Sequence, residues 1–356
     1  MTLKNRILVA PLNWGLGHAT RCIPIINALI KHHFEPIIAG DGEALQLLIK
    51  EFPTLICLEL PTYNMSYSNH GFLLKWHLLK KAPHILKAIH KEHQLVKNII
   101  KDYNIKGIIS DNRFGVYSKN KAIPSVYITH QLQVLSVATT WLTTKIHQAV
   151  IKKYDECWIP DFKTNPNFSG ILGHVKNSKL NLQYMGLLSR FSKTKAVQTH
   201  NLMVLLSGPE PQRTLLENKL LLELKTYRGS VIFVRGVIEK SSSVVQKEHL
   251  TIYNFMQSKE LEQAIQKSQI IISRSGYTSI MDFATLEKKV FFIPTPGQEE
   301  QLYLAKRLES MNIAPYCKQD EFNLEKLKRL DLYSGFSHHF DVQPDFEKLF
   351  RLFKSE

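Results

Sequence analysis

The stretch QIIISRSGYTSIMDFATLEKKVFFIPTP, residues 269–296, decides the fold of this chain. It opens and closes on short apolar runs rich in Ile, Val and Phe. Unbroken runs of this kind are typical of strands buried on both faces of a parallel sheet. The segment between them has helical spacing, so the stretch predicts a strand, a helix and a second strand parallel to the first.

The same unit recurs along the chain. Further apolar runs lie at residues 6–12, 35–40, 105–111, 124–129, 202–208, 230–236 and 250–255. Segments of helical period lie at residues 20–33, 43–51, 84–102, 212–225, 259–267 and 298–311. A polar segment at 189–201 interrupts this rhythm. We therefore expect two doubly wound α/β domains, residues 1–190 and 191–356, with a ligand-binding cleft between them. The amphipathic residues 344–356 can pack on either domain.

Composition excludes several classes of protein. With 356 residues and 44% hydrophobic residues, the chain has room for two packed cores and is not a disordered tail. Its 4 cysteines include no CxxC pair, so we expect neither a disulfide framework nor a zinc site, and reduced thiols suit a cytoplasmic protein. No run approaches the roughly 18 apolar residues of a membrane span, and the first strand does not have the pattern of a signal peptide.

The net charge of +15 predicts an anionic partner, such as a nucleotide, a nucleic acid or an acidic membrane surface. Residues 1–155 carry 19 basic and 9 acidic residues, whereas residues 156–356 carry 27 and 22. The densest cluster, residues 72–101, holds 7 Lys, one Glu and four His among apolar residues at helical spacing that Pro83 breaks. This segment either lies on an anionic membrane or is a solvated helix whose apolar stripe packs on the sheet.

The loop NWGLGHATR, residues 13–21, follows the first strand and opens a helix. Gly15 and Gly17 permit a tight turn, and the helix N-terminus favours an anion. The third glycine of a dinucleotide fingerprint is missing. His18 stands at the mouth of the helix, where an imidazole is well placed as a general base; the alternative is a turn histidine bonded to the backbone.

A second turn of this kind follows the apolar run at 202–208. Ser207 and Gly208 come directly before a helical segment, and Arg213 lies in its first turn. The pattern predicts an anion-binding turn with an arginine in reach of a phosphate, although many such turns are mere connections.

A third turn is the most specific. Ser275 and Gly276 end a buried strand and open a helix, where they can present N–H and hydroxyl donors to a diphosphate. Asp282 lies seven residues after Ser275 on the same helical face, where its carboxylate can accept from both hydroxyls of a ribose. The alternative is an acid on a helix surface.

The stretch SRSGYTSIMDFATLEKKVFFIPTPGQEEQLYLAKRL, residues 273–308, strongly resembles the nucleotide-sugar-binding region of the MurG-like glycosyltransferases of family 28. The loop GLGHATR is similar to the glycine loop of that family, with its glycines reduced to Gly15 and Gly17. The resemblance implies the GT-B fold, with the acceptor bound by the N-terminal domain and a nucleotide-sugar, usually UDP-linked, by the C-terminal domain. It implies no cofactor beyond this substrate.

The motifs and the resemblance together assign two sets of residues. The acceptor side comprises Gly15, Gly17, Asn112, Arg113, His130 and Gln131. The nucleotide-sugar side comprises Ser207, Gly208, Arg213, Arg235, Phe255, Met256, Arg274, Ser275, Gly276, Thr278, Asp282, Gln298 and Gln301. Phe255 and Met256 match the turn that brackets the base, or simply end a core strand. Gln298 and Gln301 match the turn that contacts the sugar, or cap a helix. Asp282 replaces the family's ribose-binding Glu.

The resemblance also implies an inverting, metal-independent transfer, in which a base deprotonates the acceptor hydroxyl. His18 is the first candidate for this base and Asp111 is the second. Helix N-termini at Ser207–Gly208 and Ser275–Gly276, with Arg213 or Arg274, would stabilise the charge of the leaving group.

We therefore expect a cytoplasmic glycosyltransferase, peripheral on the inner face of the membrane, that uses a UDP-sugar such as UDP-N-acetylglucosamine and a lipid-linked acceptor. Two rivals stay open. One is a nucleotide-sugar 2-epimerase of the same fold, which residues 273–301 resemble less. The other is a basic α/β protein that binds nucleic acid, which we disfavour because aromatic residues are not interleaved with Lys and Arg.

Overall fold

The computed structural model describes residues 5–63, 74–135, 140–175, 178–239, 241–336 and 343–354, with side chains left out at 74–82. The chain divides into two compact units. Among the described residues, unit 1 holds 5–63, 75–188 and 343–354, and unit 2 holds Leu74 and 189–336.

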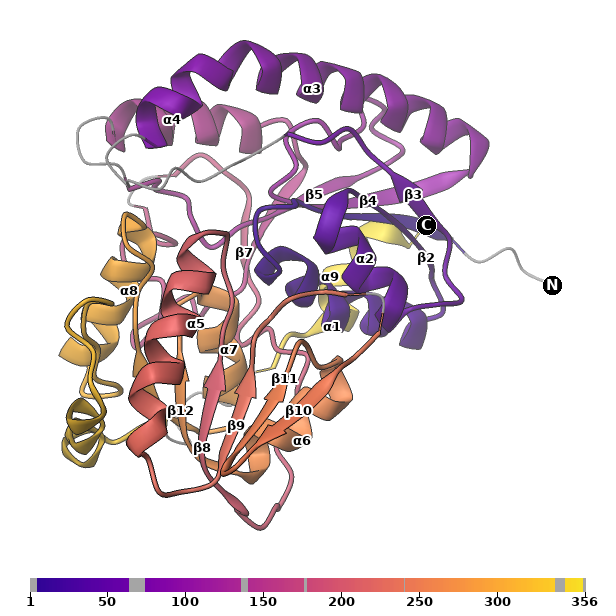
Figure 1. Ribbon diagram of the computed structural model, residues 1–356. Helices are drawn as coiled ribbons and strands as arrows, with labels where there is room; N and C mark the ends of the chain where they lie inside the picture. Colours follow the sequence, from indigo (N-terminus) through magenta and orange to yellow (C-terminus); the bar gives the residue numbers. More distant parts are fainter. Residues whose placement is uncertain are drawn as a thin grey trace. The chain divides into compact units, whose positions relative to one another are not determined.

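Unit 1 is a parallel sheet with helices on both faces (Figure 1). Within the described residues its seven strands pair in the order β3-β2-β1-β4-β5-β6-β7. Its elements are β1 (Arg6–Pro11), α1 (Gly17–Lys31), β2 (Glu35–Gly40), α2 (Gly42–Glu51), β3 (Cys57–Glu59), α3 (Leu74–Asp102), β4 (Ile105–Asp111), β5 (Ser125–Ile128), α4 (Thr140–Ile151), β6 (Glu156–Ile159), β7 (Leu182–Tyr184), α9 (Phe346–Phe350) and the 3-10 helix η5 (Arg351–Phe353).

The strands of unit 1 are buried on both faces, as their unbroken apolar runs predict. The consecutive residues Ile108 and Ile109 of β4 both have no exposed surface. Val96 and Ile99 of α3 pack on one face of the sheet against Leu8, and α1 lies on the other face (Figure 1). The fold class expected from the sequence is thus confirmed for this unit.

Helix α3 continues through Pro83, where the sequence predicted a break. Proline removes one backbone hydrogen bond, and a helix can bend there without ending if the turns on both sides stay bonded. In the C-terminal half of α3, Ala88, Val96 and Ile99 are buried in unit 1. Phe72, at the start of the basic segment, lies outside the described residues.

The chain returns to unit 1 at its C-terminal end. The ring of Phe350, fully buried, lies 5.7 Å from that of Phe34 and 6.2 Å from that of Trp158. Phe353 fills the space beside Gly107 of β4, where any larger residue would collide with its ring. The described part of this amphipathic segment, residues 344–354, therefore packs on unit 1.

Unit 2 is also doubly wound. Within the described residues its six strands pair in the order β10-β11-β9-β8-β12-β13, all parallel except the hairpin of β10 and β11. Its elements are β8 (His200–Leu205), α5 (Gln212–Glu223), the 3-10 helix η2 (Leu224–Thr226), β9 (Val231–Val234), β10 (Val244–Lys247), β11 (Leu250–Tyr253), α6 (Ser258–Lys267), β12 (Ser268–Ser273), α7 (Tyr277–Thr285), β13 (Lys289–Phe292), α8 (Glu299–Ser310) and the 3-10 helix η3 (Leu324–Leu332).

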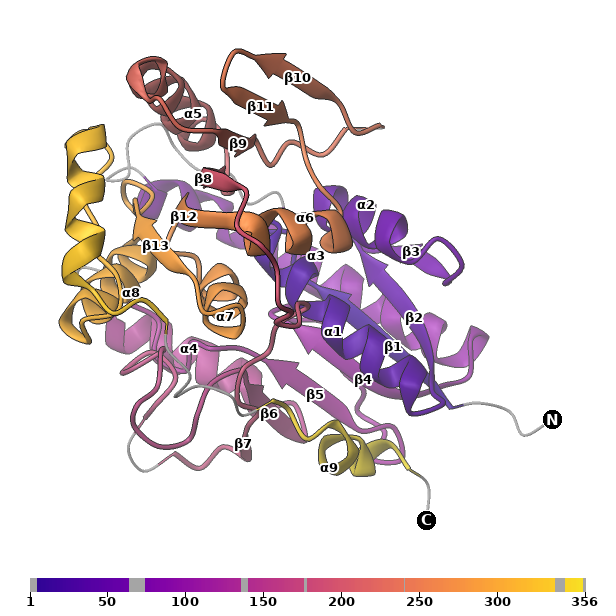
Figure 2. The same ribbon diagram turned by 90° about the horizontal axis from the view of Figure 1, so that it is seen from below.

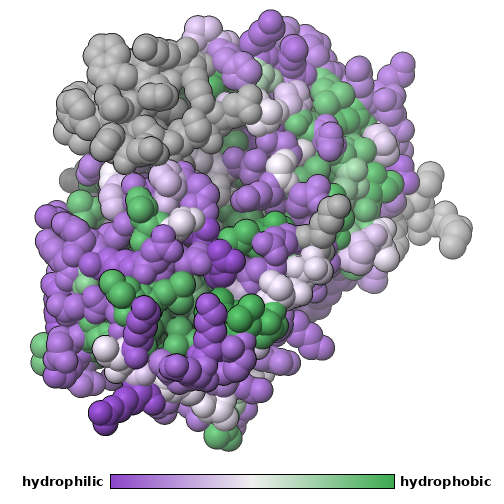
Figure 3. Space-filling view, in the orientation of Figure 1, coloured by the Kyte–Doolittle hydropathy of each residue, from purple (hydrophilic) through white to green (hydrophobic). Residues whose placement is uncertain are grey.

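Helices cover both faces of the second sheet as well. Leu216 and Leu220 of α5 pack with Val204 and Phe291 on one face, and α6 and α7 lie on the other (Figure 2). Hydrophilic side chains predominate on the face of unit 2 in Figure 3, with smaller apolar patches among them. Every helix in the described ranges is too short or too polar to cross a bilayer.

Candidate active site

The carboxyl ends of β1 and β4 meet at one edge of the sheet of unit 1, because the strands are adjacent and parallel. Pro11 and Asp111, the last residues of the two strands, are paired in the register. A turn through Gly15, whose φ of 80° favours glycine, leads from β1 into α1. His18 and Arg21 therefore stand at the start of α1, beside Asp111.

Asp111 is the centre of this cluster. Its Oδ1 lies 2.7 Å from Nδ1 of His18, and its Oδ2 accepts a hydrogen bond of 2.7 Å from Nε of Arg21. Nη2 of Arg21 also donates to Oδ1. Burial raises the pKa of Asp111, but Arg21 and His18 outweigh burial and lower the pKa to about 2. A carboxylate with so low a pKa is a weak base, and this one is fully enclosed. Asp111 therefore fits the role of a group that orients His18 better than the role of general base, for which it was the second candidate from the sequence.

His18 has the geometry of a general base. Because Oδ1 of Asp111 faces Nδ1, the proton of the neutral ring belongs on Nδ1, and Nε2 keeps its lone pair. Nη2 of Arg21 also lies 3.0 Å from Nδ1, but a guanidinium has no acceptor for that proton. Among the described residues nothing hydrogen-bonds to Nε2, and 16% of the side chain is exposed. Such a ring can take a proton from a hydroxyl group.

Arg21 is the member of the cluster that the sequence reasoning missed. Its Nη1 donates to Nδ1 of His130 over 3.0 Å, which puts the proton of a neutral His130 ring on Nε2. Arg21 thus connects α1 with the end of β4 and with the loop after β5. It stands three residues after His18 and therefore on the same face of the helix, a spacing that was visible in the sequence.

Other residues predicted on the acceptor side lie at the same edge. Asn112 follows β4 with a φ of 58°, and its Oδ1 accepts from the Tyr127 hydroxyl over 3.0 Å. Gln131 follows β5, and its N–H donates to Oγ1 of Thr129 over 3.0 Å. Gly17 is the first residue of α1. One unit therefore holds these positions around His18, and their contact with an acceptor stays a prediction.

Arg113 is the exception and requires a correction. Its side chain has no exposed surface, and it lies 2.5 Å from carboxylate oxygens of both Asp41 and Glu92. The Tyr63 ring lies 5.2 Å from its guanidinium carbon. A guanidinium enclosed by two carboxylates cannot reach an acceptor, so Arg113 holds the framework under the site.

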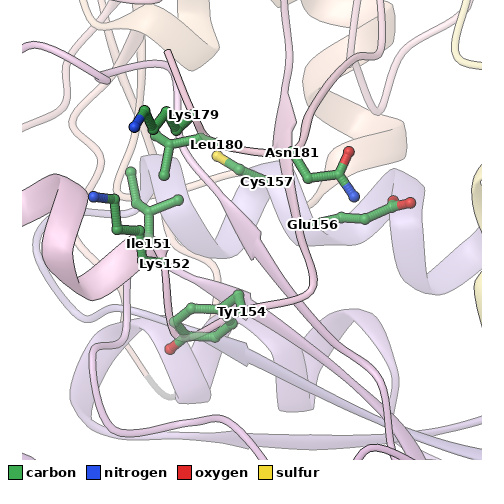
Figure 4. A pocket seen from close by; sticks show the side chains of 8 residues that line it. All are labelled: Ile151, Lys152, Tyr154, Glu156, Cys157, Lys179, Leu180 and Asn181. Atoms are coloured by element: carbon green, nitrogen blue, oxygen red, sulfur yellow. The ribbon is translucent and has the colours of Figure 1, made fainter.

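Two cavities of unit 1 lie at the opposite edge of the sheet, where the parallel strands begin. One, of about 180 Å³, is lined by Tyr154, Glu156 and Leu180 at the starts of β6 and β7 (Figure 4). The other, of about 300 Å³, is lined by Lys106 and Pro124 at the starts of β4 and β5. Neither contains a residue of the Asp111 cluster. Within the described ranges no group of three or more potential metal ligands comes together.

In unit 2, the carboxyl ends of β8 and β12 are neighbours. The turn after β8 contains Ser207 and Gly208, and the φ of 105° at Gly208 favours glycine. Gly276 is the N-cap of α7, and Thr278 lies in its first turn. A side chain at Gly276 would meet no atom closer than 4.0 Å, so the space before this helix is open.

Arg274 lies beneath these turns with 1% of its surface exposed. Its Nη1 donates to the carbonyls of Ile293 and Pro294 over 3.0 and 3.1 Å. Its Nη2 donates to the carbonyl of Gln212 over 2.9 Å and to Oε1 of Gln319 over 2.7 Å. Burial lowers the pKa of Arg274 to about 9, so it stays charged at neutral pH. Among the described residues no carboxylate forms an ion pair with it.

Ser275 and Gln301 use their polar groups to hold the turns together. The Ser275 hydroxyl, fully buried, donates to the Gln301 carbonyl over 2.8 Å, and Oε1 of Gln301 accepts from the N–H of Thr295 over 2.8 Å. We therefore correct the expectation that these side chains bind the donor, and at Ser275 only backbone groups stay candidates. Gln298, the N-cap of α8, is half-buried.

Arg213 is also already paired. Its side chain, 7% exposed, lies 2.5 Å from carboxylate oxygens of both Glu210 and Glu217. Glu217 in turn lies 2.6 Å from Nε of Arg235, whose side chain is 36% exposed. A phosphate would have to compete with two carboxylates for Arg213, whereas Arg235 is the more accessible of the two candidates.

Asp282 contacts the start of unit 2. Its Oδ1 accepts from the Ser189 hydroxyl over 2.6 Å, and its Oδ2 lies 3.7 Å from Nε of Arg190. Burial raises the pKa of Asp282 to about 6, against the opposing effects of Arg190 and Ser189. A ribose hydroxyl would have to replace Ser189 at this oxygen. Sequence reasoning could not anticipate this contact, because Ser189 and Asp282 are far apart in the chain.

Phe255 and Met256 follow β11 with 5% and 6% of their surfaces exposed. The Phe255 N–H donates to Oδ1 of Asn254 over 2.9 Å. Their side chains belong to the core, so any contact with a nucleotide base would have to come from their backbone groups.

Comparison with known proteins identifies a known domain in unit 2. Residues 212–332, all within unit 2, match the glycosyltransferase family 28 C-terminal domain. A comparison with curated proteins gives no match.

Several solved structures share the fold. The glycosyltransferase SnogD from Streptomyces nogalater superposes with a TM-score of 0.64 at 12% identity, over 99% of this chain and 100% of that one. MurG from Acinetobacter baumannii gives a TM-score of 0.57 at 12% identity, over 99% of both chains. The spinosyn rhamnosyltransferase SpnG, complexed with thymidine diphosphate, gives 0.64 at 12% identity, over 97% and 99%. This chain is therefore a glycosyltransferase with the GT-B fold, and its residues 212–332 match the family 28 C-terminal domain.

Proposed function

We propose that this protein transfers a sugar from a UDP-sugar, such as UDP-N-acetylglucosamine, to a hydroxyl group of a lipid-linked acceptor, with inversion at the anomeric carbon and without a metal ion. The observation that carries the proposal is the Asp111 cluster. It holds His18 with one nitrogen on the carboxylate and the other open, at the sheet edge where ligands of such folds bind. The family 28 domain supports a nucleotide-sugar as the donor.

In the proposed reaction Nε2 of His18 takes the proton from the acceptor hydroxyl. The acceptor oxygen then forms a bond to the anomeric carbon, while the bond from that carbon to the phosphate oxygen breaks and UDP leaves with the electron pair. Asp111 stabilises the imidazolium that forms, because its carboxylate faces Nδ1. The charge of Arg274 and the start of α7 favour the departing diphosphate.

A lipid-linked acceptor is supported by the surface of α4. Trp141, Leu142 and Ile146 are 68%, 51% and 60% exposed, and Nζ of Lys145 lies 4.1 Å from the centre of the Trp141 ring. Aromatic and aliphatic side chains beside lysine suit the interface of an anionic membrane. The basic segment 72–101 adds positive charge to the same unit. We therefore propose that the protein works at the cytoplasmic face of a membrane.

Calorimetry with UDP, dTDP, GDP and ADP tests the donor. We expect UDP to bind most tightly. Equal or tighter binding of dTDP would replace uridine by thymidine in the proposal, as SpnG is complexed with thymidine diphosphate. No binding of any nucleoside diphosphate would overturn the proposed function.

Sedimentation with vesicles containing anionic lipid tests the membrane. We expect binding that weakens as salt rises, because the attraction between charges is screened. Replacing Lys75, Lys80 and Lys81 by Glu should abolish it. The matched control makes the same change in net charge in unit 2, where Glu replaces the exposed lysines Lys225, Lys318 and Lys328. This control variant should still bind the vesicles. Equal loss in both variants would point to net charge alone, and no binding even at low salt would favour a soluble acceptor.

A further inference from the structure

Among the buried polar atoms of unit 2 that have no hydrogen-bond partner in the described residues, three belong to neighbouring residues. They are Oγ1 of Thr295, Oε1 of Gln212 and Nε of Arg274. The three residues are only 2%, 7% and 1% exposed. Buried polar groups in folded proteins are nearly always paired, so each of these atoms requires an explanation.

The three residues are neighbours, because Arg274 bridges the other two. Its Nη2 donates to the Gln212 carbonyl, and its Nη1 donates to the carbonyl of Pro294, which directly precedes Thr295. They therefore occupy one place, beneath the turns that follow β8, β12 and β13. None of the sequence motifs singled out Thr295 or Gln212 as a ligand.

The Thr295 hydroxyl faces the turn after β8. A side chain at Gly208 would put its first carbon 3.8 Å from Oγ1 of Thr295, so the hydroxyl borders the space before Gly208. The backbone of Thr295 is fixed, since its N–H donates to Oε1 of Gln301. The hydroxyl is thus held in place without a partner.

In the part of the chain that the structure describes, no carboxylate pairs with Arg274 at this place either. All four oxygens that accept from Arg274 belong to neutral carbonyl or amide groups. A buried cation without an anionic partner is unfavourable, and a bound anion would relieve it. A hydroxyl donor and a guanidinium N–H together suit phosphate oxygens, and the Gln212 amide can turn to present its NH₂ group.

We propose that Thr295 and Gln212 are further ligands of the diphosphate of the nucleotide-sugar. This role explains why their polar atoms are unpaired in the free protein. This inference rests on the proposed function. It assigns part of the affinity for the diphosphate to residues outside the turn at Arg274, Ser275 and Gly276. It also implies that the Thr295 hydroxyl destabilises the free protein and stabilises the complex.

The decisive variant is Thr295→Val, which keeps the shape of the side chain and removes only the hydroxyl. We expect a higher melting temperature for the free protein, because a buried hydroxyl without a partner is lost. We expect UDP binding, measured by calorimetry, to weaken by about 10-fold to 100-fold, the range for a lost hydrogen bond to a charged group. Gln212→Met should weaken UDP binding in the same direction.

Thr285→Val is the matched control. Oγ1 of Thr285 is also buried without a partner among the described residues, but Thr285 ends α7, at the opposite end from the open N-terminus. This variant should keep the UDP affinity of the wild type. A loss of affinity equal to that of Thr295→Val would mean a general effect of the substitution and would overturn the inference.

The outcomes separate the inference from the proposed function. Wild-type protein that binds no nucleoside diphosphate overturns both. Wild-type protein that binds UDP, with Thr295→Val binding equally well, overturns the inference alone. A lower melting temperature in Thr295→Val would show that the hydroxyl has a partner in the folded protein, and this too would overturn it.

Discussion

The cluster around Asp111 in unit 1 and the cluster around Arg274 in unit 2 occupy the same edge of two similar sheets, but their charges are arranged differently. In the first, the buried Arg21 faces a carboxylate at 2.7 Å. In the second, the buried Arg274 faces only neutral oxygens within the described residues. The first cluster pairs its charges internally, whereas we propose that an anion completes the second.

This difference separates two tasks of one enzyme. A general base must have its orientation and tautomer fixed before the acceptor arrives, and internal ion pairs provide that. A donor site must instead favour the charged ligand over water, and an unmatched buried cation provides that.

The largest effect should come from His18→Ala. We expect turnover to fall by roughly 10² to 10⁴, the usual contribution of a general base. The dissociation constant of UDP should stay the same, because the donor belongs to unit 2. Steady-state kinetics and calorimetry on the same preparation measure both quantities. Near-normal turnover would remove His18 from the mechanism.

Removing the paired and the unpaired arginine should have unequal effects on stability. Arg113→Met leaves Asp41 and Glu92 buried without their cation and should lower the free energy of unfolding by about 3 to 5 kcal/mol. Arg274→Met leaves no carboxylate behind and should lower it by about 2 kcal/mol or less. Urea unfolding measures both losses, and equal losses would contradict the difference that we draw between a buried arginine with carboxylate partners and one without.

The two buried aspartates should give opposite dependences of stability on pH. The pKa of Asp282 is raised to about 6 in the folded protein, so its contribution to stability is full below the unfolded pKa near 4. That contribution, about 2 to 3 kcal/mol, is lost as the pH rises to 6. The pKa of Asp111 is lowered to about 2, so its contribution is full above pH 4 and is lost as the pH falls toward 2.

Unfolding curves between pH 4 and pH 6.5 separate the two. Asp282→Asn should gain stability relative to wild type across this interval, because Asn cannot lose a proton. The free energy of unfolding of Asp111→Asn should differ from that of wild type by a constant amount across this interval, because Asp111 stays ionised in the folded protein. If the free energy of unfolding of Asp282→Asn instead runs parallel to that of wild type with pH, the pKa of Asp282 is not raised.

The smallest effects concern the ribose. If a ribose hydroxyl replaces Ser189 at Asp282, Asp282→Ala should weaken UDP binding by about 1.5 to 3 kcal/mol, the range for a hydrogen bond to a charged group. Ser189→Ala should leave UDP binding within about 1 kcal/mol of wild type, because only a competing neutral hydrogen bond is lost. Unchanged UDP affinity in Asp282→Ala would mean that the carboxylate does not bind the ribose. Its role would then be to hold residues 189–190 in place.

The sequence predicted the long central strands because their burial on both faces appears directly as unbroken apolar runs. β3 and β7 escaped prediction because each has only three residues and none of them is buried, and β6 escaped because its apolar run is only three residues long. The hairpin strand β10 escaped because its four residues are all exposed and only the first two, Val244 and Val245, are apolar. Strand length and depth of burial therefore decide which strands can be predicted from apolar runs in the sequence.

For the site, the sequence located the turns at the strand ends but not the direction of the side chains. His18 and Asp111 were found because the ends of adjacent parallel strands must meet. The inward hydroxyl of Ser275 and the enclosed guanidinium of Arg113 depend on distant partners, namely Gln301, Asp41 and Glu92. Partners so far apart in the chain leave no local pattern.

The return of the last helix to unit 1 sets an order of synthesis. Phe350 and Phe353 fill the space beside Trp158 and Gly107, so the first sheet to leave the ribosome lacks part of its packing until the end of the chain emerges. Residues 189–336 of unit 2 lie within that interval, and every described strand of its sheet precedes Phe350 and Phe353 in the chain. Although N-terminal domains generally fold first during synthesis, here the second unit can reach its final packing while the first still waits.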